Sequence, residues 1–254
     1  MSDAFASSRS LITWAKKNTS KLNRRLSTFF RRHGGYEPFA ESHPDKPGFF
    51  ILKVRMKKQL PNDIPAAVKD ILSNLRSALD HAVYAVAVTA GTPKPGNAYF
   101  PFSRTAEDFE RKLKGRCKDV PTELFPFFRR CQPYKGGNTA LWALNVIRGT
   151  NDHAFLVPTV GDGFVAEMIV EGEGFHSAPA HPIWDSTKNE MELMTIRSEA
   201  KLKGKFKLAF QITFGEAEEF SGRNIGEVLH LFIELVATIV DEIEAESKRL
   251  GIVR

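Results

Sequence analysis

Three long stretches of the chain carry apolar residues at the spacing of an amphipathic helix. They span residues 8–32, 63–90 and 222–249, and in each stretch the apolar side chains recur three or four positions apart, on one helical face. The second stretch stops at Gly91-Thr92-Pro93, which ends helices readily. Residues 138–148 repeat the pattern over a shorter length, and shorter helices still are expected over 105–114 and 121–131.

Alternation of apolar and polar residues predicts strands over 49–58 and 206–214, with shorter strands over 163–170 and 190–198. In the first of these, Leu52, Val54 and Met56 alternate with lysine and arginine. We therefore expect one buried face and one exposed, basic face. Residues 34–48 are rich in Gly, Pro and His, which predicts a loop.

These elements predict an α+β fold, with a helical bundle of about four longer helices and an antiparallel sheet of about four strands. We expect a single domain over residues 1–254, with the sheet largely inserted before the C-terminal helix. Along the chain, the expected parts are a basic amphipathic helix (1–33), a strand (49–58), a helical core (63–153), an antiparallel sheet (154–215) and the C-terminal helix (222–249).

The composition of the chain indicates the class of protein and its cellular compartment. The 254 residues are 42% apolar and 26% charged, as in ordinary globular proteins. No apolar run is long enough to span a membrane, and the N-terminus lacks the apolar segment of a signal peptide. Cys117 and Cys131 are the only cysteines, so we expect free thiols in a reducing compartment. A cytoplasmic protein is the resulting expectation.

The positive charge is concentrated at the N-terminus. The net charge is +6, yet residues 1–33 hold eight basic side chains against the single acid Asp3. A concentrated cationic face attracts phosphate backbones, so we hypothesise that this helix binds nucleic acid. Three alternatives remain open: a surface helix with a solvated basic back, a membrane-surface helix and an organelle transit peptide. The candidate nucleic-acid-binding residues are Lys16, Lys17, Lys21, Arg24, Arg25 and Arg31.

The helix over 63–90 has a second, unusual face. Its polar positions carry short hydrogen-bonding side chains rather than the Lys and Glu of a solvated helix. They are Asp70, Ser73, Asn74, Ser77, Asp80, His81 and Tyr84, and several of them fall within the run Asn74-Leu-Arg-Ser-Ala-Leu-Asp-His81. Such a face suggests contact with another polar surface or a ligand. RNA can be cut without a metal when its 2′-OH attacks the adjacent phosphate. That reaction needs a group that transfers protons near neutral pH, such as histidine, and a fixed cation, such as arginine, for the phosphate.

Arg76 and His81 have the spacing Arg-x4-His, which resembles the motif of HEPN-type ribonucleases. The resemblance implies a helical bundle that works as a dimer, with His81 as the acid–base group and Arg76 as the phosphate clamp. Asn74 and Asp80 are candidates to orient them. The leading hypothesis is therefore an RNA-directed protein, in particular a metal-independent endoribonuclease in a toxin or phage-defence setting. No cofactor or metal is expected.

Two other hypotheses use the same residues. In the first, the protein is a non-enzymatic binding or scaffold protein, and Arg76 and His81 join a structural polar network with a second cluster near helix 138–148. In the second, Asp80, His81 and members of that cluster converge on a metal ion. The second polar cluster consists of Asn145, Arg148, Asp152 and His153.

A further resemblance covers residues 8–153. The segment 74–81 is followed by Phe-Pro-Phe (100–102), Gln-Pro-Tyr (132–134) and Leu-Trp-x-Leu (141–144), an order similar to that in a widespread group of uncharacterised bacterial and phage-encoded proteins. The resemblance implies a bacterial or phage cytoplasmic setting and carries no function. That group ends this region with Asp-Lys-His-Arg, whereas this chain has Asn-Asp-His-Ala at 151–154.

Overall fold

The α+β class predicted from the sequence is confirmed in the computed structural model, which contains six α-helices and nine strands in its described part. The described residues are 3–32, 36–58, 61, 63–147, 156–160, 165–171, 175–177, 184–185, 187–198, 201–207, 210–214, 220 and 223–253.

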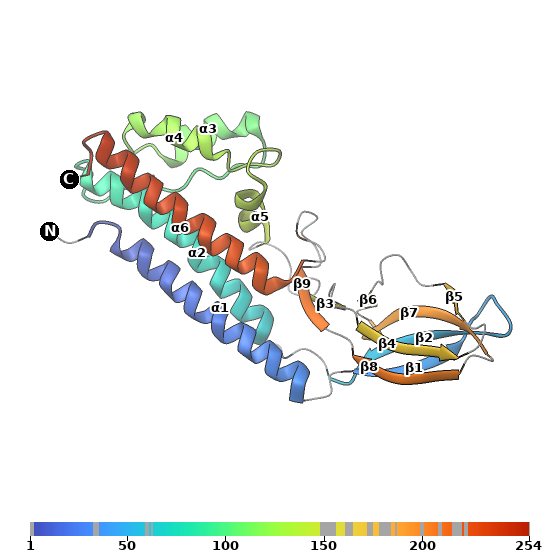
Figure 1. Cartoon of the computed structure of the whole chain (residues 1–254). Coiled ribbons are helices and arrows are strands. Elements are labelled where there is room, and N and C mark those ends of the chain that lie inside the picture. Colours follow the sequence, from blue (N-terminus) through green and yellow to red (C-terminus); the bar gives the residue numbers. More distant parts are fainter. Residues whose placement is uncertain are drawn as a thin grey trace.

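Three long helices lie side by side along most of the molecule (Figure 1). They are α1 (Ala6–Arg32), α2 (Asp63–Thr89) and α6 (Ile225–Arg249). Ser7 near the start of α1 bonds to His81 near the end of α2, while Arg25 pairs with Asp63 at the start of α2. The two helices are therefore antiparallel.

Helix α1 also runs antiparallel to α6. Arg9 pairs with Glu244 in the last turns of α6, and Lys16 pairs with Glu234, which is ten residues earlier in that helix. The contacts to α2 and those to α6 come from opposite edges of α1. The side of α1 between these two edges packs against α2 and α6, and the opposite side faces outward.

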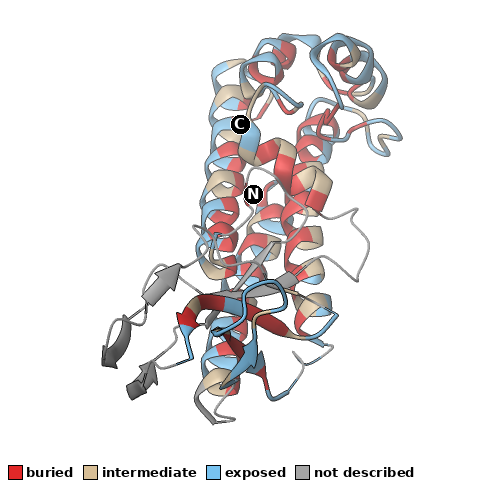
Figure 2. Cartoon of the chain, turned by 90° about the vertical axis from the view of Figure 1, so that its right-hand side faces the viewer, coloured by how far each residue is buried: buried red, intermediate tan, exposed pale blue. Residues whose placement is uncertain are grey.

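The buried faces of these helices match the predicted ones. On α2, all eight predicted core residues are at most 2% exposed. The apolar spacing of α1 predicts five core-facing residues: Ala15, Leu22, Leu26 and Phe29 are buried, and Leu11 packs partly against the core. Figure 2 shows the buried positions gathered on the facing sides of the helices. The eight residues of α2 are Ile64, Val68, Ile71, Leu72, Leu75, Leu79, Ala82 and Val86.

Shorter helices complete the helical part. They are α3 (Ala106–Arg116), the 3-10 turn η1 (Thr122–Leu124), α4 (Phe125–Cys131) and α5 (Thr139–Ile147). Phe100 and Phe128 meet edge to face in this region and are fully buried. With nine residues, α5 is much shorter than the three long helices, so the expectation of four longer helices is only roughly matched.

A sheet forms the other end of the molecule, away from the chain termini (Figure 1). Strand β2 (Phe49–Met56) lies between β1 (Tyr36–Ser42) and β7 (Glu190–Arg197), and all pairings are antiparallel. The short strands β5 (Phe175–Ser177) and β6 (Trp184–Asp185) pair with the other edge of β7. The prediction of a loop over 34–48 was wrong for β1. Pro38 is tolerated there because β1 is an edge strand, where a missing N–H need not break a ladder.

Strand β2 confirms one predicted face and corrects the other. Leu52, Val54 and Met56 are buried, as expected. Lys53 was predicted to be exposed, but it is only 8% exposed. Its ammonium group pairs with Glu41 on β1 and, at 3.3 Å, with Glu192 on β7, and the hydrogen bond to Glu41 raises its pKa. The two neighbouring strands therefore cover a side chain that alternation alone assigns to solvent.

Two further antiparallel pairs follow. Strand β3 (Leu156–Val160) pairs with β9 (Phe210–Phe214), and β4 (Val165–Glu171) pairs with β8 (Lys201–Lys207). The strand predicted over 206–214 overlaps the end of β8 and all of β9, and these two strands have different partners. Alternation specifies the face of a residue and does not record where the chain changes partner.

No helix in the described ranges is both long and apolar enough to cross a lipid bilayer.

Candidate functional site

Arg76 is the residue that the resemblance to HEPN-type ribonucleases predicts to bind a phosphate. It is buried inside the protein. It is 4% exposed. Its Nη1 atom donates a hydrogen bond of 2.7 Å to Oδ1 of Asp80, and its guanidinium carbon lies 4.1 Å from the centre of the Phe102 ring. The ring and the carboxylate both compensate the buried positive charge.

Asp80 joins helix α2 to the extended segment that precedes α3. Its Oδ1 atom accepts the Arg76 bond and also accepts a 2.9 Å hydrogen bond from the backbone N–H of Phe100. Arg76 therefore holds a carboxylate that in turn fixes the backbone of a neighbouring segment. Asn74 has a local role as well, since its amide donates to the carbonyl oxygen of Asp70 at 2.7 Å.

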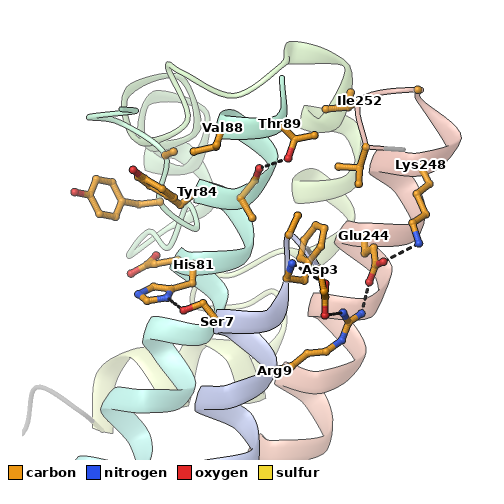
Figure 3. A pocket seen from close by; sticks show the side chains of 18 residues that line it. Asp3, Ser7, Arg9, His81, Tyr84, Val88, Thr89, Glu244, Lys248 and Ile252 are labelled. Atoms are coloured by element: carbon orange, nitrogen blue, oxygen red, sulfur yellow. Dashed lines mark hydrogen bonds and ion pairs between the residues drawn. The ribbon is translucent and has the colours of Figure 1, made fainter. Parts of the chain in front are cut away.

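His81 differs from Arg76 in being exposed. Its Nδ1 atom lies 2.7 Å from Oγ of Ser7, which is in the first turn of α1 (Figure 3). The two side chains thus form a hydrogen-bonded pair across the α1–α2 contact. Arg76 does not line the pocket into which this pair opens, whereas Asp80 and His81 do. The two residues of the Arg-x4-His motif consequently face different surroundings.

The pocket lies at the end of the molecule where the N- and C-termini meet, and its volume is about 1540 Å³. It is lined by residues 3–5 and the first turn of α1, the last part of α2, residues 98–99, and the end of α6 with residues 251–253. Tyr84 and Val88 from α2 and Tyr99 from the following segment line it with exposed apolar groups. Ligand sites are typically concave and mixed in this way, with apolar walls and a few polar groups.

A chain of ion pairs crosses one wall of the pocket (Figure 3). Arg9 bonds to Asp3 at 2.7 Å and to Glu244, and Lys248 bonds to Glu244 at 2.7 Å. The hydrogen bond from Lys248 lowers the pKa of Glu244, and the bond from Arg9 lowers the pKa of Asp3. Both carboxylates stay ionised at neutral pH, so each cation has an anionic neighbour.

The basic residues predicted to bind nucleic acid fall into two groups. Lys16 pairs with Glu234 at 3.1 Å, and Arg25 pairs with Asp63. Lys17, Lys21 and Arg24 are exposed, and within the described ranges they have no ion-pair partner. Their positions four and three residues apart align them along the outward face of α1. The side chain of Arg31 lies outside the described residues.

The second polar cluster is only partly described. Asn145 is half-buried on α5, while Arg148, Asp152 and His153 lie outside the described residues. The proposed joining of this cluster to the motif, and the metal-site hypothesis that needs Asp152 and His153, are therefore untested. In the part of the chain that the structure describes, no three His, Cys, Asp or Glu side chains gather as a metal site.

The thiols were predicted to be free, and they are. Burial raises the pKa of Cys117 to about 12 and that of Cys131 to about 12, so neither is a reactive nucleophile at neutral pH.

Sequence reasoning did not find Ser7, Arg9 or Tyr99 as parts of the site. No motif marks them, because they come from segments far from α2 in the chain and reach the pocket only through the fold. Tyr84 had a signal, since it lies on the polar face of α2 one turn after His81.

Comparison with known proteins adds no family assignment: no family model, no curated protein and no solved structure matches this chain.

Proposed function

We propose that this protein is RNA-directed and binds the phosphate backbone of RNA through the outer face of α1. One observation carries the proposal: Lys17, Lys21 and Arg24 share that face, are exposed and have no ion-pair partner in the described ranges. Cations that are already paired within a protein gain little from a phosphate, whereas unpaired ones release counterions when they bind it. Trp14 is also exposed beside this face and offers a ring on which a base can stack.

The test is binding of single-stranded RNA as a function of salt. In a variant with Lys17→Gln, Lys21→Gln and Arg24→Gln, three phosphate contacts are lost, so the slope of log K against log salt should fall by roughly 2. The matched control carries Lys112→Gln, Lys114→Gln and Lys118→Gln, which removes the same charge from exposed lysines elsewhere. If both variants bind RNA as tightly as the wild type, or lose affinity equally, the α1 face is not the binding site.

A second candidate function is metal-independent RNA cleavage with His81 as the acid–base group. The observation that favours it is the exposure of His81 in a pocket, within hydrogen-bonding distance of Ser7. Arg76 then acts as a positioning residue that holds Asp80, because its guanidinium is already engaged by Asp80 and Phe102. This assignment differs from the phosphate clamp of HEPN-type enzymes.

Cleavage of total RNA in EDTA tests this candidate. The wild type should cut, His81→Ala should not, and both should melt at similar temperatures, since His81 is exposed. If the setting is a toxin or defence system, producing the wild type in a bacterial host should arrest growth, and producing His81→Ala should not. An uncut substrate with the wild type leaves RNA binding without catalysis as the function.

The proposal includes a homodimer, as in the ribonucleases that the motif resembles. Light scattering of the purified protein checks it, with the mass of one chain, 28.5 kDa, as the result that contradicts it.

A further inference from the structure

The exposed apolar side chains of the described residues are not scattered over the surface. Tyr84 and Tyr99 are each 44% exposed and Val88 is 39% exposed, and all three line the pocket at the termini. Only Trp14 and Leu231 are other large apolar residues with comparable exposure in the described ranges. Grouped exposed apolar side chains usually mark a binding surface, and two of these three are aromatic.

The charges around the pocket cancel. Arg9 and Lys248 are neutralised by Asp3 and Glu244, as described above, and Asp80 is paired with the buried Arg76. A phosphate or another multiply charged anion would have to displace a carboxylate from its cation. The pocket therefore favours a ligand without net charge that presents a flat, apolar face, and it does not favour the phosphate beside His81 that the cleavage candidate needs.

Next to Tyr84, the pocket also has a polar side chain, His81, that can bind a ligand. His81 lies one turn before Tyr84 on α2, and its Nδ1 atom is engaged by Ser7. The other ring nitrogen, Nε2, has no hydrogen bond within the described part of the chain. It can therefore donate to or accept from a ligand that rests against the tyrosines.

We propose that this pocket receives one unstacked base of single-stranded RNA; the inference rests on the RNA binding proposed for α1. A nucleobase is flat and uncharged, it stacks on aromatic rings, and its edge has donors and acceptors that suit His81. Ser7 lines the pocket, and Lys17 is ten residues further along the same helix, which is about 15 Å at 1.5 Å per residue. One strand can thus place a base in the pocket while its following phosphates contact the cations of α1.

The test uses oligouridylate in which one uridine at a time is replaced by 2-aminopurine, whose fluorescence is quenched on stacking. With the wild type, we expect strong quenching at one position of the bound oligonucleotide. The double variant Tyr84→Leu, Tyr99→Leu should abolish that quenching and weaken binding about tenfold, as expected for loss of base stacking. Tyr84→Phe with Tyr99→Phe should retain most of the quenching, because both rings remain. Leu231→Ala is the control for losing an exposed apolar side chain outside the pocket.

The outcomes separate the two proposals. RNA binding that is salt-dependent and sensitive to the α1 substitutions, with quenching unaffected by the tyrosine substitutions, overturns the base pocket and leaves the α1 interface standing. Absence of any RNA binding overturns both. Quenching lost equally with Leu231→Ala and with the tyrosine variant would also reject the pocket, because the signal would then not depend on its rings.

Discussion

Arg76 belongs to a motif that suggests catalysis, but the contacts that it makes are structural. Its spacing from His81 fits a ribonuclease motif, but its guanidinium lies over Phe102 and bonds to Asp80 inside the protein. A buried arginine needs both a carboxylate and a polarisable surface to offset the loss of water. Arg76 has both, so its first effect is on stability, whatever happens at His81.

Replacing Arg76 by lysine tests this role. Lysine keeps the charge, but its ammonium group cannot lie flat on the Phe102 ring and bond to Asp80 at once, so we expect Arg76→Lys to lower the free energy of unfolding by about 2 kcal/mol. Arg76→Ala should cost about 3 kcal/mol or more, because Asp80 loses its counter-charge. Urea unfolding measures both. Arg111→Lys, at an exposed ion pair on α3, should change stability by less than about 0.5 kcal/mol. A fully stable Arg76→Lys protein would contradict the structural role.

Only the residues of the site that lie on α2 could be predicted from the sequence. Periodicity placed His81 and Asp80 on a face distinct from the core of α2, and both do line the pocket. Spacing could not predict that Ser7 would meet His81, since the two are 74 residues apart and come together only when α1 docks. Nor could it predict that Arg76 would turn inward, which depends on where Phe102 packs.

At the scale of elements, ion pairs stabilise the contact between the start of α1 and the end of α6. Glu244 accepts hydrogen bonds from Lys248 and Arg9, and its side chain is 17% exposed. These bonds lower the pKa of Glu244. A lowered folded-state pKa means that the stabilisation is present above the unfolded-state pKa and is lost as the pH falls through the folded-state value.

This linkage predicts the pH dependence of a variant. Glu244→Gln should lower the free energy of unfolding by about 1–2 kcal/mol at pH 7. The difference from the wild type should be smaller at an acidic pH, below the ordinary glutamate pKa of about 4.3, because the wild-type carboxylate becomes protonated as the pH falls through its lowered value. Thermal or urea unfolding at both pH values provides the measurement. The control Glu242→Gln, at an exposed position on the same helix, should stay within about 0.5 kcal/mol of the wild type. A pH-independent defect in Glu244→Gln would point to packing rather than charge.

Helices were easier to predict than strands for a physical reason. The long helices carry their apolar stripe within one continuous segment, so α1, α2 and α6 were found close to their true bounds. Strands depend on partners elsewhere in the chain. Strand β1, with its proline and glutamates, exists because it pairs with β2, and residues 201–214 change partner between β8 and β9. The alternation of apolar and polar residues within a segment indicates neither the pairing of β1 with β2 nor the different partners of β8 and β9.

At the scale of the whole molecule, the described residues of the helical part and of the sheet have separate sets of buried side chains. The main hydrophobic cluster contains residues from α1 to α6 and from the segments between the helices, but none of the buried residues of β2 and β7. The sequence predicts a single domain. Whether the two parts unfold as one depends on how strongly they are coupled, and proteins commonly open in cooperative units of this size.

Hydrogen–deuterium exchange of two core variants can measure that coupling. Val54→Ala in β2 and Leu79→Ala in α2 each truncate a fully buried side chain, and each should cost about 2–4 kcal/mol locally. If the parts are independent, Val54→Ala should speed exchange in β1, β2 and β7 and leave α2 protected, while Leu79→Ala does the reverse. If the chain is one cooperative domain, either variant should speed exchange of the most protected amides in both parts. Because the α1 face and the terminal pocket lie wholly in the helical part, the first outcome also predicts that Val54→Ala binds RNA as the wild type does.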